Sequence, residues 1–283
     1  MVVDKSKKKV KKPSSNNKMK KAKPSQQKKE KRSNRKDEEI QVDFDFFNMD
    51  TPDFHSIKLF LNVAFGLNST VDTSQLAGLI TDDLSEYIGN TAKTEGEESD
   101  ALGFTSIIPL SWEREKTKSL TAFYQNFMQF DAATTVLVLH ERVINLPPPV
   151  ALQLFNILLD DFANAQSEHP AFKNVSHIII STPTLKKKSK DDEEDSDEEE
   201  SDISEEEQAG SSDDRLEHEF PEADLLDSLC EARHDYKVPT SHETGDSRRL
   251  FSKQGVEKWR SVYKLSLKSF KAYISQLNQT LND

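Results

Sequence analysis

The chain of 283 residues contains few glycines and a single cysteine. There are eight glycines, and no two of them lie within six residues of each other. A phosphate-binding loop needs clustered glycines, because backbone N–H groups must approach the ligand closely. The sequence therefore excludes a P-loop, a dinucleotide fingerprint and an acyl-CoA pyrophosphate loop. Cys230 cannot form an intramolecular disulfide, and its isolation favours a reducing compartment.

Long apolar runs and catalytic motifs are absent as well. No apolar stretch approaches the roughly 18 residues that a membrane helix requires, and the basic N-terminus is not followed by the apolar segment of a secretory signal. There is no G-x-S-x-G motif. Cys230 and His234 have a ligand-like spacing but lack a second pair. We therefore expect a soluble intracellular protein that is not an enzyme and has no membrane association, cofactor or metal site.

Charge is distributed very unevenly along the chain. The apolar content is 34% and the mean hydropathy is -0.73. Residues 1–36 hold sixteen Lys and Arg against two acidic residues, a net charge of +14. Because the whole chain has a formal charge of -12, residues 37–283 carry -26. The sequence thus joins a basic arm to a strongly acidic body.

The basic arm, residues 1–36, has almost nothing to bury, and we expect it to be disordered. Dense short basic runs are typical of nuclear import signals. RNA contact, alone or in addition, and a merely solubilising tail are the alternatives. The arm has no aromatic residue on which a base could stack, so any RNA binding would be phosphate-driven and sensitive to salt. The residues predicted to form the import signal are Lys7, Lys8, Lys9, Lys11 and Lys12.

Residues 184–215 are predicted to be a disordered acidic insertion, since no apolar periodicity survives there. Asp191–Glu207 contains thirteen carboxylates in seventeen residues. Ser196, Ser204 and Ser211 each have an acidic residue three positions later, which matches acid-directed kinases, although chance matches are frequent in so acidic a run. A loop of this charge would attract a Lys/Arg-rich partner protein, here called the client. The residues expected to contact it are Asp191, Asp192, Glu193, Glu194, Asp195, Asp197, Glu198, Glu199 and Glu200.

Residues 134–162 are the predicted core of the fold. Thr134–Leu139 has no polar face, which is typical of a strand covered on both sides. Pro147, Pro148 and Pro149 end this extended segment, and the last proline can open a helix over residues 150–162. Further strands are predicted near residues 40, 102, 175 and 259, with helices between them. This pattern indicates a single three-layer α/β or α+β domain of residues 37–183 and 216–283, with a mixed central sheet flanked by helices.

Other segments have simpler patterns. Residues 54–65 are predicted to be a helix, with Leu59 and Val63 among the side chains that face the core. Helices are also expected over residues 74–81, 115–130, 220–232 and 270–281, and a loop over residues 92–100. Trp112 and Trp259 are expected to pack in the core or at its margin rather than anchor a partner.

His140 and Glu141 follow the core strand, and one interpretation is an acid–base pair. The favoured interpretation is a strand edge that meets solvent, with Glu141 and Arg142 paired locally. We also expect exposed apolar side chains that serve a partner near residues 143–149 and on the last strand and helix.

Several motifs together resemble the BCCIP family of eukaryotic nuclear proteins, over about residues 38–283. They are VDFDFF at 42–47, DFH at 53–55, LGF at 102–104 and ERVINLPP at 141–148. The last is the most specific. Its structural signature residues are Glu141, Arg142, Asn145, Leu146, Pro147 and Pro148.

The resemblance implies a fold similar to N-acetyltransferases without the acyl-CoA site, and no catalytic residues. Fungal members of the family share the basic tail and the acidic insertion. They act as nuclear chaperones for one large-subunit ribosomal protein and are tied to nuclear export of a phosphatidylinositol phosphate kinase. Vertebrate members are linked to cell-cycle inhibition and genome maintenance.

The working hypothesis is a nuclear, non-enzymatic chaperone and transport adaptor that shuttles to the cytoplasm. Its partners would be a basic ribosomal protein of the large subunit, nuclear transport receptors and, by resemblance, a phosphatidylinositol phosphate kinase. The acidic charge makes nucleic acid an unfavourable partner for the folded body. The alternatives are an RNA-binding nuclear protein that uses the basic arm and a degenerate acyltransferase.

Overall fold

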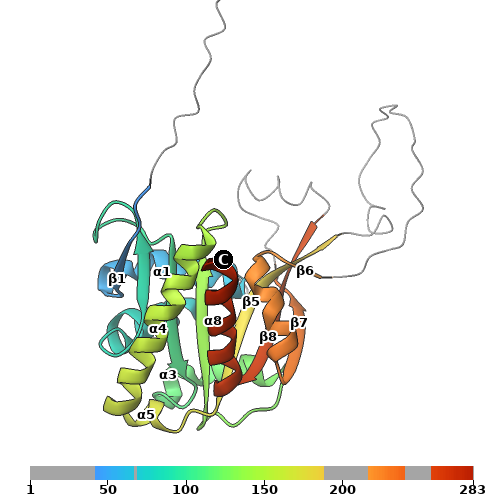
Figure 1. Ribbon diagram of the computed structural model, residues 1–283. Coiled ribbons are helices and arrows are strands. Elements are labelled where there is room, and N and C mark those ends of the chain that lie inside the picture. Colours follow the sequence, from blue (N-terminus) through green and yellow to red (C-terminus); the bar gives the residue numbers. More distant parts are fainter. Residues whose placement is uncertain (1–41, 67–68, 188–215, 240–255, 283) are drawn as a thin grey trace, which may run out of the picture. The chain divides into compact units, whose positions relative to one another are not determined.

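The computed structural model describes residues 42–66, 69–187, 216–239 and 256–282 (Figure 1). These residues contain one mixed sheet of eight strands in the order β1-β2-β3-β4-β5-β8-β7, with β6 paired to β5. All neighbours are antiparallel except β4 and β5. The strands are β1 Asp45–Asn48, β2 Asn90–Lys93, β3 Gly103–Pro109, β4 Thr135–Arg142, β5 His177–Lys187, β6 Glu217–His218, β7 Ala232–Lys237 and β8 Val256–Ser266.

Helices cover both faces of this sheet, so the predicted three-layer arrangement is confirmed. Figure 1 shows α4 and α8 in front of the strands and α1 behind them. None of the described helices is long and apolar enough to cross a membrane. The α-helices are α1 Phe54–Phe65, α2 Thr73–Gly78, α3 Arg114–Gln125, α4 Pro148–Glu168, α5 Pro170–Lys173, α6 Asp224–Leu229 and α8 Leu267–Asn282; shorter helical turns are η1 Thr51–Asp53, the π-helix η2 Leu79–Leu84 and η4 Pro221–Ala223.

The predicted core unit is confirmed and is longer than expected. Every residue of β4 is buried, as a strand covered on both faces requires. Pro148 occupies the first position of α4, where a missing N–H costs nothing, and Pro147 precedes it as the cap. Leu154, Phe155, Leu158 and Phe162 are each at most 1% exposed, because α4 packs on β2, β3 and α8.

Several predicted boundaries are wrong. Residues 184–187 belong to β5, which stays paired with β8 as far as Lys187, so the insertion begins later than predicted. The first two residues of the loop predicted over 92–100, Ala92 and Lys93, belong to strand β2, and the helix predicted over 220–232 ends at Leu229, before strand β7. The three strands that the sequence did not predict, β2, β6 and β7, are short and mostly polar, so none of them shows the alternation of apolar residues that identifies a strand.

Helix α1 corrects a prediction about individual side chains. Leu59 and Val63 were expected to face the core, but they are 67% and 61% exposed. The buried stripe of α1 instead consists of Ile57, Leu61 and Ala64, which recur at helical spacing and are at most 2% exposed. One stripe is enough to cover the sheet, and Leu59 and Val63 lie on the other side of the helix.

Replacing Gly66 with alanine tests how α1 ends. Gly66 has φ 80°, and an added Cβ would lie 2.8 Å from the carbonyl oxygen of Pro239. We expect Gly66→Ala to lower the free energy of unfolding by about 1–3 kcal/mol through backbone strain alone, and further through this clash. Gly96→Ala is the matched control, since Gly96 has φ 88° but open space around it. Equal losses in urea denaturation would show that the contact with Pro239 is unimportant.

Candidate functional site

The sheet divides where β4 and β5 separate. These parallel strands pair only from Thr135 to Val138 on β4 and from His177 to Ile180 on β5. Beyond this point β3 continues to pair with β4, and β8 continues to pair with β5. The carboxyl ends of neighbouring parallel strands are a common place for ligands in α/β proteins. This divergence is therefore the first candidate site.

On one face of the sheet a buried ion pair spans the divergence. Arg260 on β8 donates through both Nη atoms to the carboxylate of Glu141 on β4, with Nη1 3.2 Å from Oε2. It also donates to Ser181 on β5, from Nε to Oγ and from Nη2 to the backbone oxygen, both at 2.9 Å. Burial raises the pKa of Glu141, and the Arg260 guanidinium opposes that rise. The two side chains are 7% and 3% exposed, so water does not screen the pair.

On the opposite face Arg142 holds the segment that follows the insertion. Its Nη2 donates to the carboxylate of Glu222, and its guanidinium carbon lies 4.0 Å from the ring centre of Phe220. Its Nη1 also donates to the backbone oxygen of Leu146 at 3.4 Å. The predicted local pairing of Glu141 with Arg142 is thus wrong. Consecutive residues of a strand point to opposite faces, so each finds a distant partner.

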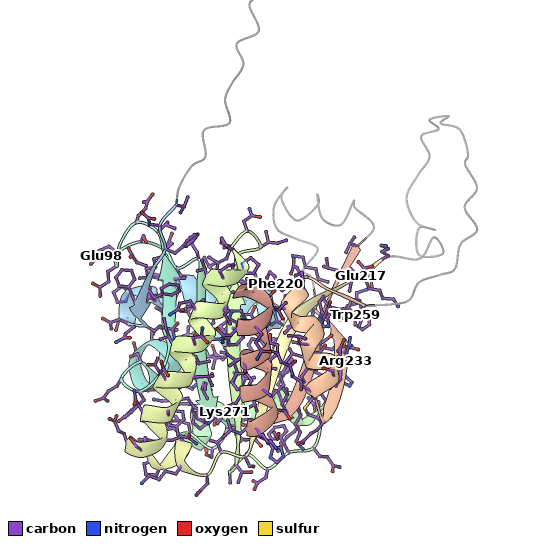
Figure 2. The ribbon with its side chains drawn as sticks, viewed as in Figure 1. Glu98, Glu217, Phe220, Arg233, Trp259 and Lys271 are labelled. Atoms are coloured by element: carbon purple, nitrogen blue, oxygen red, sulfur yellow. The ribbon has the colours of Figure 1, made fainter. Side chains whose placement is uncertain are left out.

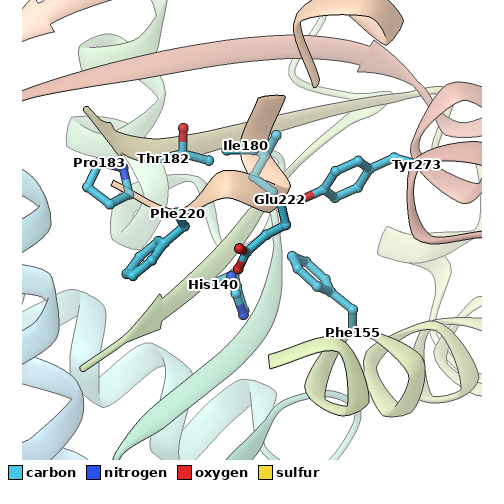
Figure 3. A pocket seen from close by; sticks show the side chains of 9 residues that line it. His140, Phe155, Ile180, Thr182, Pro183, Phe220, Glu222 and Tyr273 are labelled. Carbon is cyan, nitrogen blue, oxygen red and sulfur yellow. The ribbon is translucent and has the colours of Figure 1, made fainter. Parts of the chain in front are cut away.

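The space left in the divergence is very small. Figure 3 shows His140, Phe155, Phe220, Glu222 and Tyr273 converging on it. The cavity has a volume of about 10 Å³, close to the size of one water molecule. Phe220 and Glu222 fill the space that an organic ligand would need. No room for an acyl group and its carrier remains at this place.

His140 is suited to packing rather than to proton transfer. Its ring lies 4.1 Å from that of Phe155, and within the described part of the chain its Nε2 has no hydrogen-bond partner. Burial, helped by the charge of Arg142, lowers the pKa of His140 to about 3, so the ring is neutral at physiological pH. His140 and Glu141 also point to opposite faces, so the acid–base pair weighed from the sequence does not form. The expected solvent-exposed strand edge is wrong too, because both residues are buried.

A second hollow lies where α3 begins. It has a volume of about 420 Å³ and is lined by residues 111–113 and 169–171. Trp112, 7% exposed, packs against the His169 ring at 4.4 Å, as predicted for a core tryptophan.

Across the described residues, no group of three or more His, Cys, Asp or Glu could hold a metal ion. Burial raises the pKa of the Cys230 thiol, which makes it a weak nucleophile.

The net negative charge of the described residues comes mainly from residues 42–66 and 69–100, which include β1 and β2. The described residues contain sixteen Lys and Arg and twenty-seven Asp and Glu, and twelve of these acids lie in residues 42–66 and 69–100. Lys58 and Lys93 are the cations of those two ranges, and Lys93 is buried 2.7 Å from Asp53. Figure 2 shows Glu98 on the side of β1, away from Arg233 and Trp259. The exposed acids of these two ranges, here called the acidic edge, are Asp43, Asp45, Asp50, Asp72, Asp82, Glu86, Glu95, Glu97, Glu98 and Asp100.

Some of the remaining predicted residues are described by the structure, and the others lie outside the described ranges. In the family motif, Leu146 is buried, Asn145 is exposed, and Pro147 and Pro148 start α4. At the predicted apolar corner, Val143 and Ile144 are 38% and 64% exposed. The import lysines, the acidic client-contact residues 191–200 and the serines Ser196, Ser204 and Ser211 lie outside the described residues, and their roles stay predictions.

The fold and the closed divergence define a mixed-sheet protein in which internal ion pairs occupy the usual ligand position between parallel strands. The BCCIP family model matches residues 39–226, and the chain belongs to this family. Protein bcp1 of Emericella nidulans is 26% identical over 264 residues, which cover 86% of this chain and 88% of that protein. Protein BCP1 of Saccharomyces cerevisiae is 32% identical over 140 residues, 45% of this chain and 48% of that protein. Its crystal structure aligns with a TM-score of 0.52 and 22% identity, over 87% of this chain and 92% of that chain.

The sequence contained a signal for the missed ion pairs. Arg260 shares its strand with three other charged residues and is not singled out by its neighbours, whereas Glu141 and Arg142 end a strand whose apolar run predicts burial on both faces. A charge in such a position needs a partner of opposite sign nearby in space. The identity of the partner is not encoded locally, because 119 residues separate Arg260 from Glu141.

Removing Arg260 tests the pair. Arg260→Met should lower the free energy of unfolding by about 3–5 kcal/mol, because Glu141 is left buried without a counter-charge. The double variant Arg260→Met with Glu141→Leu removes both charges and should lose clearly less. Urea denaturation at pH 7 measures both. Equal losses in the single and double variants would show that the pairing itself is not what matters.

His140 predicts a specific dependence of stability on pH. The unfolded state gains a proton on His140 below about pH 6.5, whereas the folded state resists protonation until about pH 3. The stability contributed by the neutral ring is present above pH 6.5 and is lost as pH falls toward 3. Between pH 6.5 and 5 the wild type should lose about 2 kcal/mol more than His140→Phe. The same substitution at the exposed His55 controls for removing an imidazole, and parallel pH profiles for wild type and His140→Phe would contradict the expectation.

Proposed function

We propose that this chain is a non-enzymatic chaperone and transport adaptor that binds a basic ribosomal protein of the large subunit and supports ribosome biogenesis. The observation that carries the proposal is the acidic edge, which presents ten exposed carboxylates beside one half-exposed lysine, Lys58. The acidic run Asp191–Glu207 adds thirteen carboxylates to the same chain. A surface of this sign attracts a Lys/Arg-rich protein.

Charge of this kind explains how a chaperone would protect such a client. A free basic protein binds RNA phosphates without sequence preference, through an attraction that weakens as salt is added. An acidic surface competes for the same lysines and arginines and lowers the chance of nonspecific binding. At physiological ionic strength the attraction extends over about 8 Å, so it accelerates encounter more than it fixes one geometry.

The closed divergence supports the non-enzymatic part of the proposal. Its cavity of about 10 Å³ excludes an organic substrate, and Glu141, Arg142 and Arg260 are engaged in internal ion pairs. A degenerate acyltransferase would need this place to be open. The alternative of an RNA-binding protein rests on the basic arm, whose residues 1–36 carry +14.

Location and transport belong to the same proposal. The cluster Lys7–Lys12 is proposed to bind an import receptor, so that the protein is nuclear and shuttles to the cytoplasm. Nuclear transport receptors are therefore proposed partners. Export of a phosphatidylinositol phosphate kinase is included by resemblance to the family.

Reversing charge on the acidic edge tests the proposal. The variant Glu95→Lys/Glu97→Lys/Glu98→Lys changes three exposed side chains of the loop between β2 and β3. In affinity purification of the full chain from RNase-treated nuclear extract, the wild type should retain one basic large-subunit ribosomal protein in stoichiometric amount. The variant should retain at least tenfold less, because steering and pairing are both weakened.

The control makes the same change of charge elsewhere. Glu115→Lys/Glu168→Lys/Glu217→Lys replaces three exposed acids outside residues 42–100 and should retain the client. Equal loss in both variants would reduce the protein to a generic polyanion. A complex that resists high salt would argue against charge as the main attraction, and binding that disappears with RNase would favour the RNA alternative.

A further inference from the structure

The outward side of α1 exposes two large apolar side chains that the fold does not use. Leu59 and Val63 are 67% and 61% exposed, and they are four residues apart, so they lie next to each other on the helix surface. The helix already buries Ile57, Leu61 and Phe65 in the core. Leu59 and Val63 thus form a small apolar patch on the exposed side of the helix. This patch is here called the α1 face. Grouped apolar side chains of this kind mark interaction surfaces more often than scattered single ones.

Hydrogen bonds place acidic residues around the α1 face. Near the start of the helix, Ser56 donates to Asp100 at 3.2 Å, so the loop between β2 and β3 is held against α1. At the other end Asn62 accepts a hydrogen bond from Thr73 at 2.7 Å, next to the exposed Asp72. Carboxylates from two separate segments therefore flank the helix. The sequence of α1 itself contains no acidic residue and one lysine, Lys58.

We propose that the α1 face is the docking surface for a Lys/Arg-rich protein segment that presents a pair of apolar side chains. The inference rests on the proposed function and adds the place where that binding becomes selective. The carboxylates of the acidic edge would bring the basic segment to the helix. Burial of Leu59 and Val63 would then distinguish a matching segment from any other polycation.

Charge decides which partner can bind the α1 face. A second copy of the chain would bring its own acidic edge against the first, which like-charge repulsion disfavours. An anionic lipid surface would be repelled for the same reason. A basic protein segment satisfies both properties of the surface, because its cations meet the flanking carboxylates while its apolar side chains cover Leu59 and Val63.

The test uses two synthetic helical peptides, one Lys-rich with two leucines four residues apart and one in which serines replace these leucines. Fluorescence anisotropy measures their Kd for the full chain at low and at physiological salt. The wild type should bind the leucine peptide roughly thirtyfold more tightly than the serine peptide, the size expected for burying two apolar side chains incompletely. Leu59→Ser/Val63→Ser should bind both peptides equally while its urea midpoint stays unchanged, since both side chains are exposed.

Val143→Ser/Ile144→Ser is the matched control, because it removes the other exposed apolar pair and should keep the preference. A preference that survives in Leu59→Ser/Val63→Ser overturns the inference. The inference is also overturned if the wild type sediments as a dimer and Leu59→Ser/Val63→Ser as a monomer, because the α1 face would then bind a second copy of the chain. If the wild type and both variants bind the two peptides equally, and this binding is lost as salt is added, the inference fails and the proposed function stands. If neither peptide binds the wild type, the proposed function fails with it.

Discussion

The buried ion pair between Glu141 and Arg260 is the interaction on which the rest of the structure depends. It joins the two halves of the sheet where β4 and β5 separate, and Ser181 accepts two further hydrogen bonds from the guanidinium. Removing two charges from water costs free energy, which a buried pair recovers only with good geometry and further hydrogen bonds. Arg142 and Glu222 repeat the arrangement on the opposite face and fix the segment Phe220–Ala223 over the divergence. The two pairs together convert a possible cleft into core.

Because the divergence is closed, the candidate site for binding lies on the surface of the protein and not inside the sheet. The cavity that remains is about the size of one water molecule, whereas residues 42–66 and 69–100, which include β1 and β2, expose ten carboxylates. A protein with a filled interior and a strongly charged edge is suited to holding another protein. Membership in the BCCIP family and the likeness to the yeast BCP1 structure agree with this architecture.

The sequence predicted best what is determined locally. Thr134–Leu139 and the prolines before α4 identified the central strand and helix, because apolar runs and a fixed proline φ act over a few residues. The sequence did not predict the short polar strands β2, β6 and β7, since their place is set by neighbouring strands. The partners of Glu141 and Arg142 and the exposure of Leu59 and Val63 depend on how distant elements pack. Of the candidate surfaces, the acidic character was readable from composition, whereas its position beside α1 required the fold.

The pairing of β5 with β6 has a consequence for how the chain can vary in length. Thr184 lies opposite His218 and Leu185 opposite Glu217, so the two ends of residues 188–215 leave the sheet from neighbouring strands. When the ends of a connection are already fixed side by side, each doubling of its length adds only about 0.6 kcal/mol of closure entropy. Relatives can therefore lengthen or shorten this connection with little effect on folding. The same position is a suitable place to insert a fluorescent protein or an affinity tag without disturbing the sheet.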